Sequence, residues 1–455
     1  MSKKTEFASK IGLIAATVGS AIGLGNVWRF PAETQANGGA AFLLLYMVCV
    51  MALGVPVMLA EFSLGRGGRA DAVGVFKKLA PGTSWWLVGA VAVLTPYLIA
   101  CYYMVVAGWT LEYFWETIFG SLYQGVGTIP PEALQGQFAA KMNDYVCTPL
   151  KPLVFTALII AVNIIVLLGG VQKGIERLSN VMMPLLFVIL AAMAVVSLSL
   201  PDAGEGVKFF LSPDFSKITP KVVINALGQA LFSLSIGMGI LITYSSYYPA
   251  NTKLTRTSVI VALLSMLVAV MMGMIIFPAV KSFGLDNQPL EGATLVFVTL
   301  PEVFAQLPFA QLWSSLFFLL LLVAALTSTV SICEVPIAML QDRFKLSRKA
   351  SVLIVMCPLF VLSSLCSLSF SSLEEFKILG LTVFNLLDSF TTDILLPLVA
   401  LALCIFMGWF APKGLLKEQL TNHGSLQSPT APLSIFVIRY VAPAIIIIIF
   451  VSNYF

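Results

Sequence analysis

Long apolar runs, each followed by a short polar segment, repeat along the whole chain. Runs of this length are typical of helices that cross the hydrocarbon core of a membrane. Two polar stretches are longer than the others, at about 117–152 and 284–308, and the second contains enough apolar residues to form a short helical cap. The pattern predicts about eleven spans, near residues 11–33, 41–66, 87–116, 153–171, 178–200, 222–247, 257–280, 309–341, 350–370, 383–410 and 432–453.

The composition supports a membrane location. Of the 455 residues, 59% are hydrophobic and 11% are charged, and the mean hydropathy is +0.96. Soluble domains are only about 45–50% apolar. Because the apolar runs extend from end to end, we expect an all-α polytopic membrane protein that forms a single domain over residues 1–455.

The positions of lysine and arginine predict the orientation. If the N-terminus is cytoplasmic, the segments on that side collect seventeen positive residues, and those on the opposite side hold seven. Such a bias is the usual signature of cytoplasmic loops. We therefore expect a multi-pass protein of the cell inner (plasma) membrane with its N-terminus inside and, given an odd number of spans, its C-terminus outside.

One glycine pattern occurs twice. "IGLG" at residues 22–25 in the first span recurs as "IGMG" at 236–239 in the sixth, with Ser20 and Ser235 close by. A glycine within a helix costs about 1 kcal/mol relative to alanine, so these two spans are expected to be broken. Broken spans at matching positions of two repeats indicate a substrate and ion site near the bilayer midplane, whereas close helix packing through small residues is the alternative. The chain then divides into two inverted five-helix repeats and one additional helix, at 11–200, 222–410 and 432–453.

Polar side chains gather near both interruptions. Asn26 follows the first, and Gln229 and Ser233 precede the second, while the eighth span places Thr327 and Ser328 within a run of leucines. Hydroxyls, amides and free carbonyls are hard oxygen ligands that suit an alkali cation. The alternative for each hydroxyl is a hydrogen bond to its own helix.

Four charged residues remain in apolar surroundings: Arg29, Glu61, Glu334 and Asp388. Each is costly there unless it is paired or hydrated. Arg29 lies one turn beyond the first interruption and Asp388 lies near the outer end of the tenth span, so the pair is a candidate outer gate. A static ion pair or a snorkelling side chain is the alternative.

Several classes of protein lack support. The chain has no GxxxxGK[ST] loop and no His or Cys set with metal-binding spacing, and its only histidine is His423, in a polar segment. No nucleophile stands beside a base in any span. An ion gradient is therefore the expected source of energy, and we do not expect an enzyme.

Several long motifs resemble the neurotransmitter:sodium symporter family, and more narrowly its bacterial members typified by the leucine transporter. The resemblance covers nearly the whole chain and rests on "GSAIGLGNVWRFP" (19–31), "NGGAAFLLLY" (37–46), "YYMVVAGWTL" (102–111), "GQALFSLSIGMGILITYSSY" (228–247) and "ALTSTVSICE" (325–334). It implies import of a solute by alternating access, driven by sodium.

The resemblance also implies ligands for two sodium ions. The first ion would be held by Ala21, Asn26, Ser233 and Ser265 together with the substrate carboxylate. The second would be held by the carbonyls of Gly19, Ile22 and Ala324 and the hydroxyls of Thr327 and Ser328.

The substrate and the gates follow from the same resemblance. The substrate carboxylate would meet the amides near Leu24 and Gly25 and the Tyr103 hydroxyl. The remaining substrate contacts implied are Ser20, Ala21, Ile99, Phe232, Ser233, Ser235, Met238, Ser328 and Ile332. Tyr103 and Phe232 would form a thin outer lid, Arg29 with Asp388 a wider one, and Lys4 with Asp342, near Tyr247, the inner gate.

Three departures from the family pattern bear on function. The family's monoamine carriers have an aspartate where this chain has Gly23, so an amino acid, which brings its own carboxylate, is favoured over an amine. Lys4 stands where an arginine is usual, which predicts a looser inner gate. Ser265 stands near the first sodium site, where bacterial members usually carry a carboxylate, and Tyr46, Gln229, Ser233 and Ser265 then resemble the chloride site of animal members. Chloride dependence is therefore a hypothesis.

The leading interpretation is a sodium-coupled symporter for an apolar amino acid, and the flexible Met238 would accommodate a large or aromatic one. Its partners are the amino acid, two sodium ions and the bilayer; no nucleic acid is expected, and the oligomeric state stays open. An amino-acid-binding membrane sensor without net transport is the alternative. A cation channel is disfavoured because gate pairs on both sides suggest an occluding carrier.

Overall fold

The structure is a computed structural model that describes residues 6–126, 130–285 and 292–452. Regular structure in these ranges is helical, apart from a single bridge between Ile378 and Leu381. The α-helices are α1 (Lys10–Ala21), α2 (Phe30–Ala36), α3 (Ala40–Cys49), α4 (Val55–Gly68), α5 (Ala72–Leu79), α6 (Trp86–Ile118), α7 (Pro131–Cys147), α8 (Leu150–Leu168), α9 (Arg177–Leu198), α10 (Ala203–Leu211), α11 (Pro220–Ser233), α12 (Ile240–Ser245), α13 (Leu254–Ser282), α14 (Gly292–Thr294), α15 (Leu300–Ala305), α16 (Ala310–Phe344), α17 (Arg348–Leu368), α18 (Val383–Ser389), α19 (Leu396–Ile405), α20 (Leu415–Leu420), α21 (Ala431–Phe436) and α22 (Ala442–Ser452). Short π-helical segments connect several of them, at Gly25–Arg29, Val50–Gly54, Val171–Glu176, Leu295–Thr299, Phe390–Leu395, Phe406–Phe410 and Val437–Val441.

Within the described residues, nine helices are long and apolar enough to cross a membrane, and a bent pair at the N-terminus makes a tenth. The all-α polytopic membrane fold is therefore confirmed. The count of eleven spans and the division into two inverted repeats stay predictions. The predicted sixth span falls below the length criterion because it consists of two short helices, α11 and α12.

Both predicted interruptions are present. The first separates α1 from the helix that starts at Gly25, and the two halves are bent by 57°. The second separates α11 from α12, and Ser235, Gly237 and Gly239 there have positive φ angles of 53°, 84° and 66°. Glycine adopts this conformation without steric cost. A Cβ on Gly237 would also lie 2.7 Å from the Leu396 carbonyl oxygen, so the broken chain passes directly against α19.

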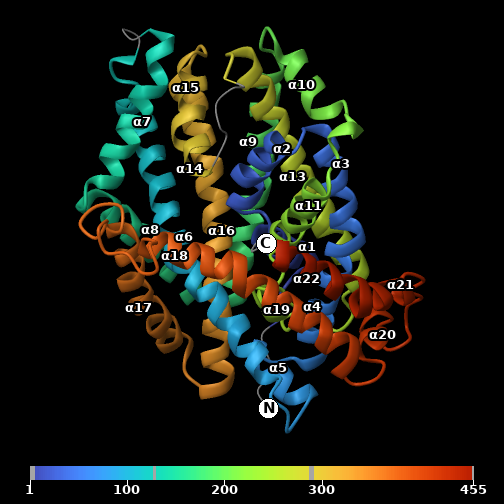
Figure 1. The fold of residues 1–455 in the computed structure, drawn as a ribbon. Helices are drawn as coiled ribbons and strands as arrows, with labels where there is room; N and C mark the ends of the chain where they lie inside the picture. Colours follow the sequence, from blue (N-terminus) through green and yellow to red (C-terminus); the bar gives the residue numbers. More distant parts are fainter. Residues whose placement is uncertain (1–5, 127–129, 286–291, 453–455) are drawn as a thin grey trace.

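The interrupted helices lie against long continuous ones. α16 packs against α6, α9 and α1, and α12 packs against α4. At Gly65 the α4 backbone approaches α12 so closely that a Cβ would overlap the Ile242 carbonyl oxygen. Figure 1 shows α7, α10 and α15 at one end of the molecule and the N-terminus with α5 at the other.

The two longer polar stretches contain helices of their own. The first holds α7, and the second holds α14 and α15 joined by a π-helical turn. Side chains of that turn are buried, and Phe297 packs against Trp109 and Tyr113 of α6 at ring distances of 5.9 and 4.9 Å. The helical cap expected near 284–308 is therefore present over residues 292–305.

Candidate functional site

A cavity of about 470 Å³ lies beside both interruptions. It is bounded by α1 and α2, by the segment between α11 and α12, and by α6, α16 and α18. All twelve residues predicted to contact the substrate line it: Ser20, Ala21, Leu24, Gly25, Ile99, Tyr103, Phe232, Ser233, Ser235, Met238, Ser328 and Ile332. The structure thus brings the predicted set together from distant parts of the chain.

The first interruption supplies a polar end to this cavity. The Leu24 amide, which has no helical partner, donates a hydrogen bond to the Tyr103 hydroxyl at 3.0 Å. Gly23 must be small here because a Cβ would lie 2.9 Å from both the Tyr103 and the Ser328 hydroxyl oxygens. A helix begins just beyond, and the free amides and positive dipole of a helix start favour an anion. This end of the cavity therefore suits a carboxylate.

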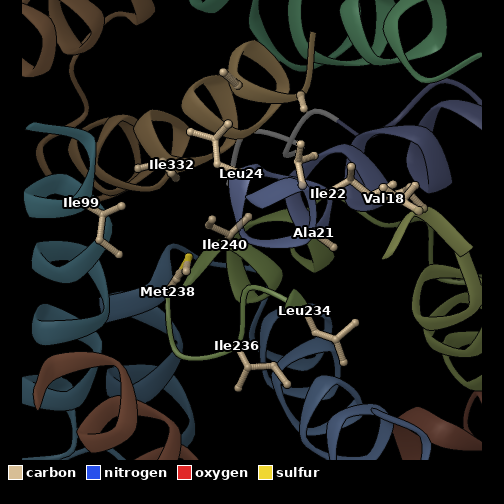
Figure 2. Close-up of a cluster of buried hydrophobic side chains, with 14 of the residues drawn as sticks. Val18, Ala21, Ile22, Leu24, Ile99, Leu234, Ile236, Met238, Ile240 and Ile332 are labelled. Carbon is tan, nitrogen blue, oxygen red and sulfur yellow. The ribbon is translucent and has the colours of Figure 1, made fainter. Parts of the chain in front are cut away.

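The opposite walls are apolar. Figure 2 shows Ile99 on α6, Met238 between α11 and α12, and Ile332 on α16 around the interruption of α1. The Phe232 ring also lines the cavity. Next to these walls the Ser235 hydroxyl donates to the Ser20 carbonyl at 2.7 Å, so the two interruptions are joined by a hydrogen bond. The cavity thus combines a polar end with a hydrophobic body, as expected for a binding site of a small amphipathic molecule.

A first cluster of buried oxygens surrounds Asn26. The Asn26 amide nitrogen donates to the Ala21 carbonyl at 3.0 Å and to the Ser265 hydroxyl at 3.1 Å. Ser265 in turn donates to the Ser233 carbonyl at 3.2 Å. The Asn26 Oδ1 atom is buried and has no hydrogen-bond partner among the described residues. An unpartnered buried oxygen beside carbonyl and hydroxyl groups fits the first predicted sodium site.

A second cluster joins the end of α1 to α16. The Ser328 hydroxyl lies 3.4 Å from the Gly19 carbonyl oxygen and 3.3 Å from that of Ile22. The Thr327 hydroxyl lies 3.1 Å from the Ala324 carbonyl oxygen. These are the five residues predicted for the second sodium ion, and all are buried. Neutral oxygen donors from two helices again suit an alkali cation better than a transition metal.

The four residues predicted to bind chloride are also buried close to the first cluster. The Tyr46 hydroxyl donates to the Ser233 hydroxyl at 3.1 Å, and the Gln229 side-chain nitrogen donates to the Gly25 carbonyl at 3.2 Å. Ser265 links this set to Asn26. The set contains hydroxyl and amide donors and no carboxylate.

The two charges of the predicted outer gate line the same cavity. The ion pair that Arg29 makes within the described residues is with Glu33, at 3.8 Å on its own helical segment, and its guanidinium lies 4.8 Å from the centre of the Phe232 ring. Contact between Arg29 and Asp388 therefore stays a prediction.

The opposite end of the protein is closed by aromatic packing. Phe7 lies among Tyr244, Tyr247 and Tyr248, with ring distances of 5.9, 6.3 and 6.1 Å. The Tyr247 hydroxyl donates to the buried Glu334 carboxylate at 2.9 Å. This packing separates the substrate cavity from the N-terminal end.

A second cavity, of about 630 Å³, lies at that end and is lined by Tyr247, Asp342, Glu334 and Arg348, among others. Arg348 donates to both Glu334 oxygens, at 2.9 and 2.6 Å. Lys4, the predicted partner of Asp342, lies outside the described residues. The predicted inner pair is therefore untested.

Some residues at these sites had not been singled out from sequence. Trp28, Tyr102 and Thr392 line the substrate cavity. At the inner end the Glu176 carboxylate accepts hydrogen bonds from the Ala8 amide (2.8 Å), the Ser9 amide (3.0 Å) and the Ser9 hydroxyl (2.7 Å), and so holds the start of α1. Tyr102 could have been found from sequence, because it stands next to Tyr103 in "YYMVV". Nothing in the sequence pairs Glu176 with residues 8 and 9.

Glu61 is a further buried charge. The Gly237 amide donates to the Glu61 carboxylate at 2.8 Å, and this hydrogen bond connects α4 to the segment between α11 and α12.

A bundle of membrane-length helices with a cavity at two interrupted helices is the architecture of a membrane transporter. Comparison with known proteins identifies the kind of transporter. The sequence profile of the sodium:neurotransmitter symporter family matches residues 4–125 and 147–455. The chain belongs to this family, whose members are sodium-coupled transporters and not enzymes.

Individual relatives extend over nearly the full length. A sodium-dependent transporter of Bacillus subtilis, YhdH, is 37% identical over 99% of this chain and 98% of its own length. A sodium-dependent transporter of Haemophilus influenzae is 34% identical over 100% of this chain and 99% of its own. The crystal structure of MhsT in complex with L-phenylalanine superposes with a TM-score of 0.88, at 40% identity, and covers 99% of this chain and 100% of MhsT.

Proposed function

We propose that this protein imports an apolar amino acid together with sodium by alternating access. The observation that carries the proposal is the cavity at the two interruptions, which joins the Leu24 amide and the Tyr103 hydroxyl at one end to apolar walls at the other. A zwitterion with an apolar side chain matches both ends. The similarity to MhsT, whose structure holds L-phenylalanine, supports a large or aromatic side chain.

The substrate is expected to lie along the cavity in one direction. Its carboxylate would accept from the amides near Leu24 and Gly25 and from Tyr103, and its ammonium would face the carbonyls of Ala21 and Phe232 and the Ser235 hydroxyl. The side chain would lie against Ile99, Met238 and Ile332. Gly23 leaves no fixed carboxylate at this end, so the substrate itself must carry one.

Two sodium ions would occupy the two oxygen clusters. The first would be held by Ala21, Asn26, Ser233 and Ser265 and would also touch the substrate carboxylate, which couples ion binding to substrate binding. The second would bridge the end of α1 to α16 through Gly19, Ile22, Ala324, Thr327 and Ser328. Because this ion holds two helices together, its release would favour their separation.

Chloride is proposed to balance these charges. Two sodium ions and a zwitterion leave an excess of positive charge in a site whose oxygen clusters contain no carboxylate. The donors of Tyr46, Gln229, Ser233 and Ser265 lie where an anion would offset it. We therefore expect uptake to depend on chloride.

The proposed cycle places the N-terminus in the cytoplasm and the C-terminus outside, in the inner (plasma) membrane. The cavity that reaches Arg29 and Asp388 would then face outward, and the Phe7 packing would close the inner side. Inward release would require Phe7 to separate from Tyr244, Tyr247 and Tyr248, and the start of α1 to separate from Glu176. The two five-helix repeats proposed for residues 11–200 and 222–410 would supply the two broken helices.

Transport by purified protein in liposomes tests the proposal. We expect uptake of phenylalanine or another apolar amino acid under an inward sodium gradient and none when potassium replaces sodium. Uptake should fall when gluconate replaces chloride at fixed sodium and membrane potential, and an unchanged rate would refute the chloride proposal alone. Sodium-dependent binding without uptake would identify the sensor alternative, and neither binding nor uptake would refute both.

A further inference from the structure

The segment between α17 and α18 ends in an exposed hairpin. The Ile378 amide donates to the Leu381 carbonyl at 2.9 Å, and the Leu381 amide donates back to the Ile378 carbonyl at 3.0 Å. The two residues between them, Leu379 and Gly380, have φ angles of 53° and 81°. Positive φ at both central positions is the pattern of a two-residue type I′ turn.

Leucine is an unfavourable residue for the first position of this turn. Asparagine, aspartate or glycine is usual there because a side chain with a Cβ is crowded when φ is positive. Leu379 is 91% exposed, so no contact with the part of the chain that the structure describes compensates. A strained residue that presents its side chain outward indicates that this side chain has a partner outside the chain.

The surroundings of the hairpin indicate which partner. Phe376 and Ile378 beside the turn are 55% and 43% exposed. Residues 369–375 form a turn segment that connects the hairpin to α17, a membrane-length helix that exposes Val361 and Ile354 at 59% and 50%. In Figure 1 the segment between α17 and α18 lies at the edge of the molecule. The apolar tip thus continues a surface that faces lipid.

Charged residues in the same segment fit the boundary of a bilayer better than its interior. Glu374, Glu375 and Lys377 are all exposed next to the apolar tip. Segments that lie in a membrane interface combine apolar side chains with charges that remain in the headgroup layer. A stable contact with a second copy of the chain needs about 1,000 Å² of buried surface, far more than one two-residue turn offers.

We propose that this hairpin, residues 376–381, is a membrane-interface anchor that inserts Leu379 at the boundary between lipid headgroups and acyl chains. The anchor lies close to the substrate cavity along the chain. Phe384, at the start of α18, donates its amide to the Ser369 hydroxyl at 3.4 Å and packs on Phe370 at 5.0 Å. α18 also carries Asp388 of the cavity wall. The anchor therefore fixes the outer end of a cavity-lining helix relative to the bilayer.

Spin labelling in lipid nanodiscs tests the anchor. The exposed Cys147 and Cys357 are replaced, and a label is attached at Leu379→Cys or, as a control on a polar exposed turn, at Thr83→Cys. Oxygen concentrates in lipid, whereas a chelated nickel relaxant stays in water. We expect the label at 379 to gain relaxation by oxygen and lose relaxation by nickel relative to the control.

A second variant separates the anchor from the turn. Leu379→Asn introduces a residue that tolerates positive φ. The hairpin should therefore persist, while its apolar tip is lost. A label at Ile378→Cys should then show more relaxation by nickel than in the protein with Leu379. Equal accessibility at 379 and 83, or no change in the Leu379→Asn background, would overturn the proposal. Broadening between labels that disappears on dilution with unlabelled protein would assign the tip to a second copy and overturn it too. None of these readouts depends on transport.

Discussion

Ser328→Ala is the sharpest test of the ion sites, because one oxygen is removed where α1 meets α16. The Ser328 hydroxyl lies 3.3 and 3.4 Å from the Ile22 and Gly19 carbonyl oxygens. Alanine keeps the helix and leaves the other predicted ligands in place. Its only chemical effect on the proposed sodium site is the loss of one of five oxygens.

The magnitude follows from the strength of contacts to charged groups. A hydrogen bond to a charged group contributes about 1.5–3 kcal/mol, and we take a similar value for a hydroxyl that coordinates a cation. Every 1.4 kcal/mol is a factor of ten in affinity, so sodium binding should weaken about 10- to 150-fold. Because substrate binding is coupled to sodium, the sodium concentration for half-maximal uptake should rise by a similar factor.

The assay is substrate uptake into liposomes as a function of sodium, with ionic strength held constant. Thr329→Val provides a matched control, since the Thr329 hydroxyl is bonded to the Leu326 carbonyl of its own helix at 3.1 Å. We expect the control to leave the sodium concentration for half-maximal uptake, the sodium midpoint, unchanged. An unchanged midpoint in Ser328→Ala, or equal shifts in both variants, would refute the assignment of the second ion.

Further predictions address the inner end and the chloride proposal. In Gly12→Ala the new Cβ would overlap the Glu176 carboxylate, so the start of α1 should loosen, and substrate efflux from preloaded liposomes should accelerate. Efflux at the original rate would contradict a role of Glu176 in holding the start of α1 closed. Arg348→Ala would leave the Glu334 carboxylate buried without its cationic partner, at a cost of about 3–5 kcal/mol. The melting temperature should fall, and adding Glu334→Gln to Arg348→Ala should partly restore it. An unchanged melting temperature would show that the pair is hydrated. Ser265→Glu adds a fixed negative charge and should remove the response of uptake to chloride replacement, and a persistent chloride response would place the anion elsewhere.

The membrane fold and the positions of the two interruptions could be predicted from the sequence, because both depend on local properties of the chain. Apolar runs of sufficient length predict spans directly, and paired glycines such as those at 236–239 predict a break. The resemblance to a known family then supplied the residues of the cavity, and the structure places them around a single volume. Their roles in binding remain proposals.

Contacts between distant residues could not be predicted in the same way. Glu176 is 167 residues from Ser9, and neither position has a pattern that points to the other. The ion pair of Arg29 with the residue one turn away, Glu33, was not predicted either, and the contact with Asp388 stays a prediction. A local helical pair forms without any rearrangement of the chain, whereas contact across a cavity depends on how far that cavity is open.

The contact between α4 and α12 has a mechanical consequence. At Gly65 the α4 backbone lies directly against the Ile242 carbonyl and the Ser245 hydroxyl of α12, and the Glu61 carboxylate accepts a hydrogen bond from the Gly237 amide just before α12. Helices joined so closely cannot roll or slide past one another without a clash, because interiors are close-packed. α4 and α12 should therefore move together as one rigid unit when the transporter changes conformation. Probes on α4 and α12 would keep a constant separation through the cycle, while the separation of either from α16 would change.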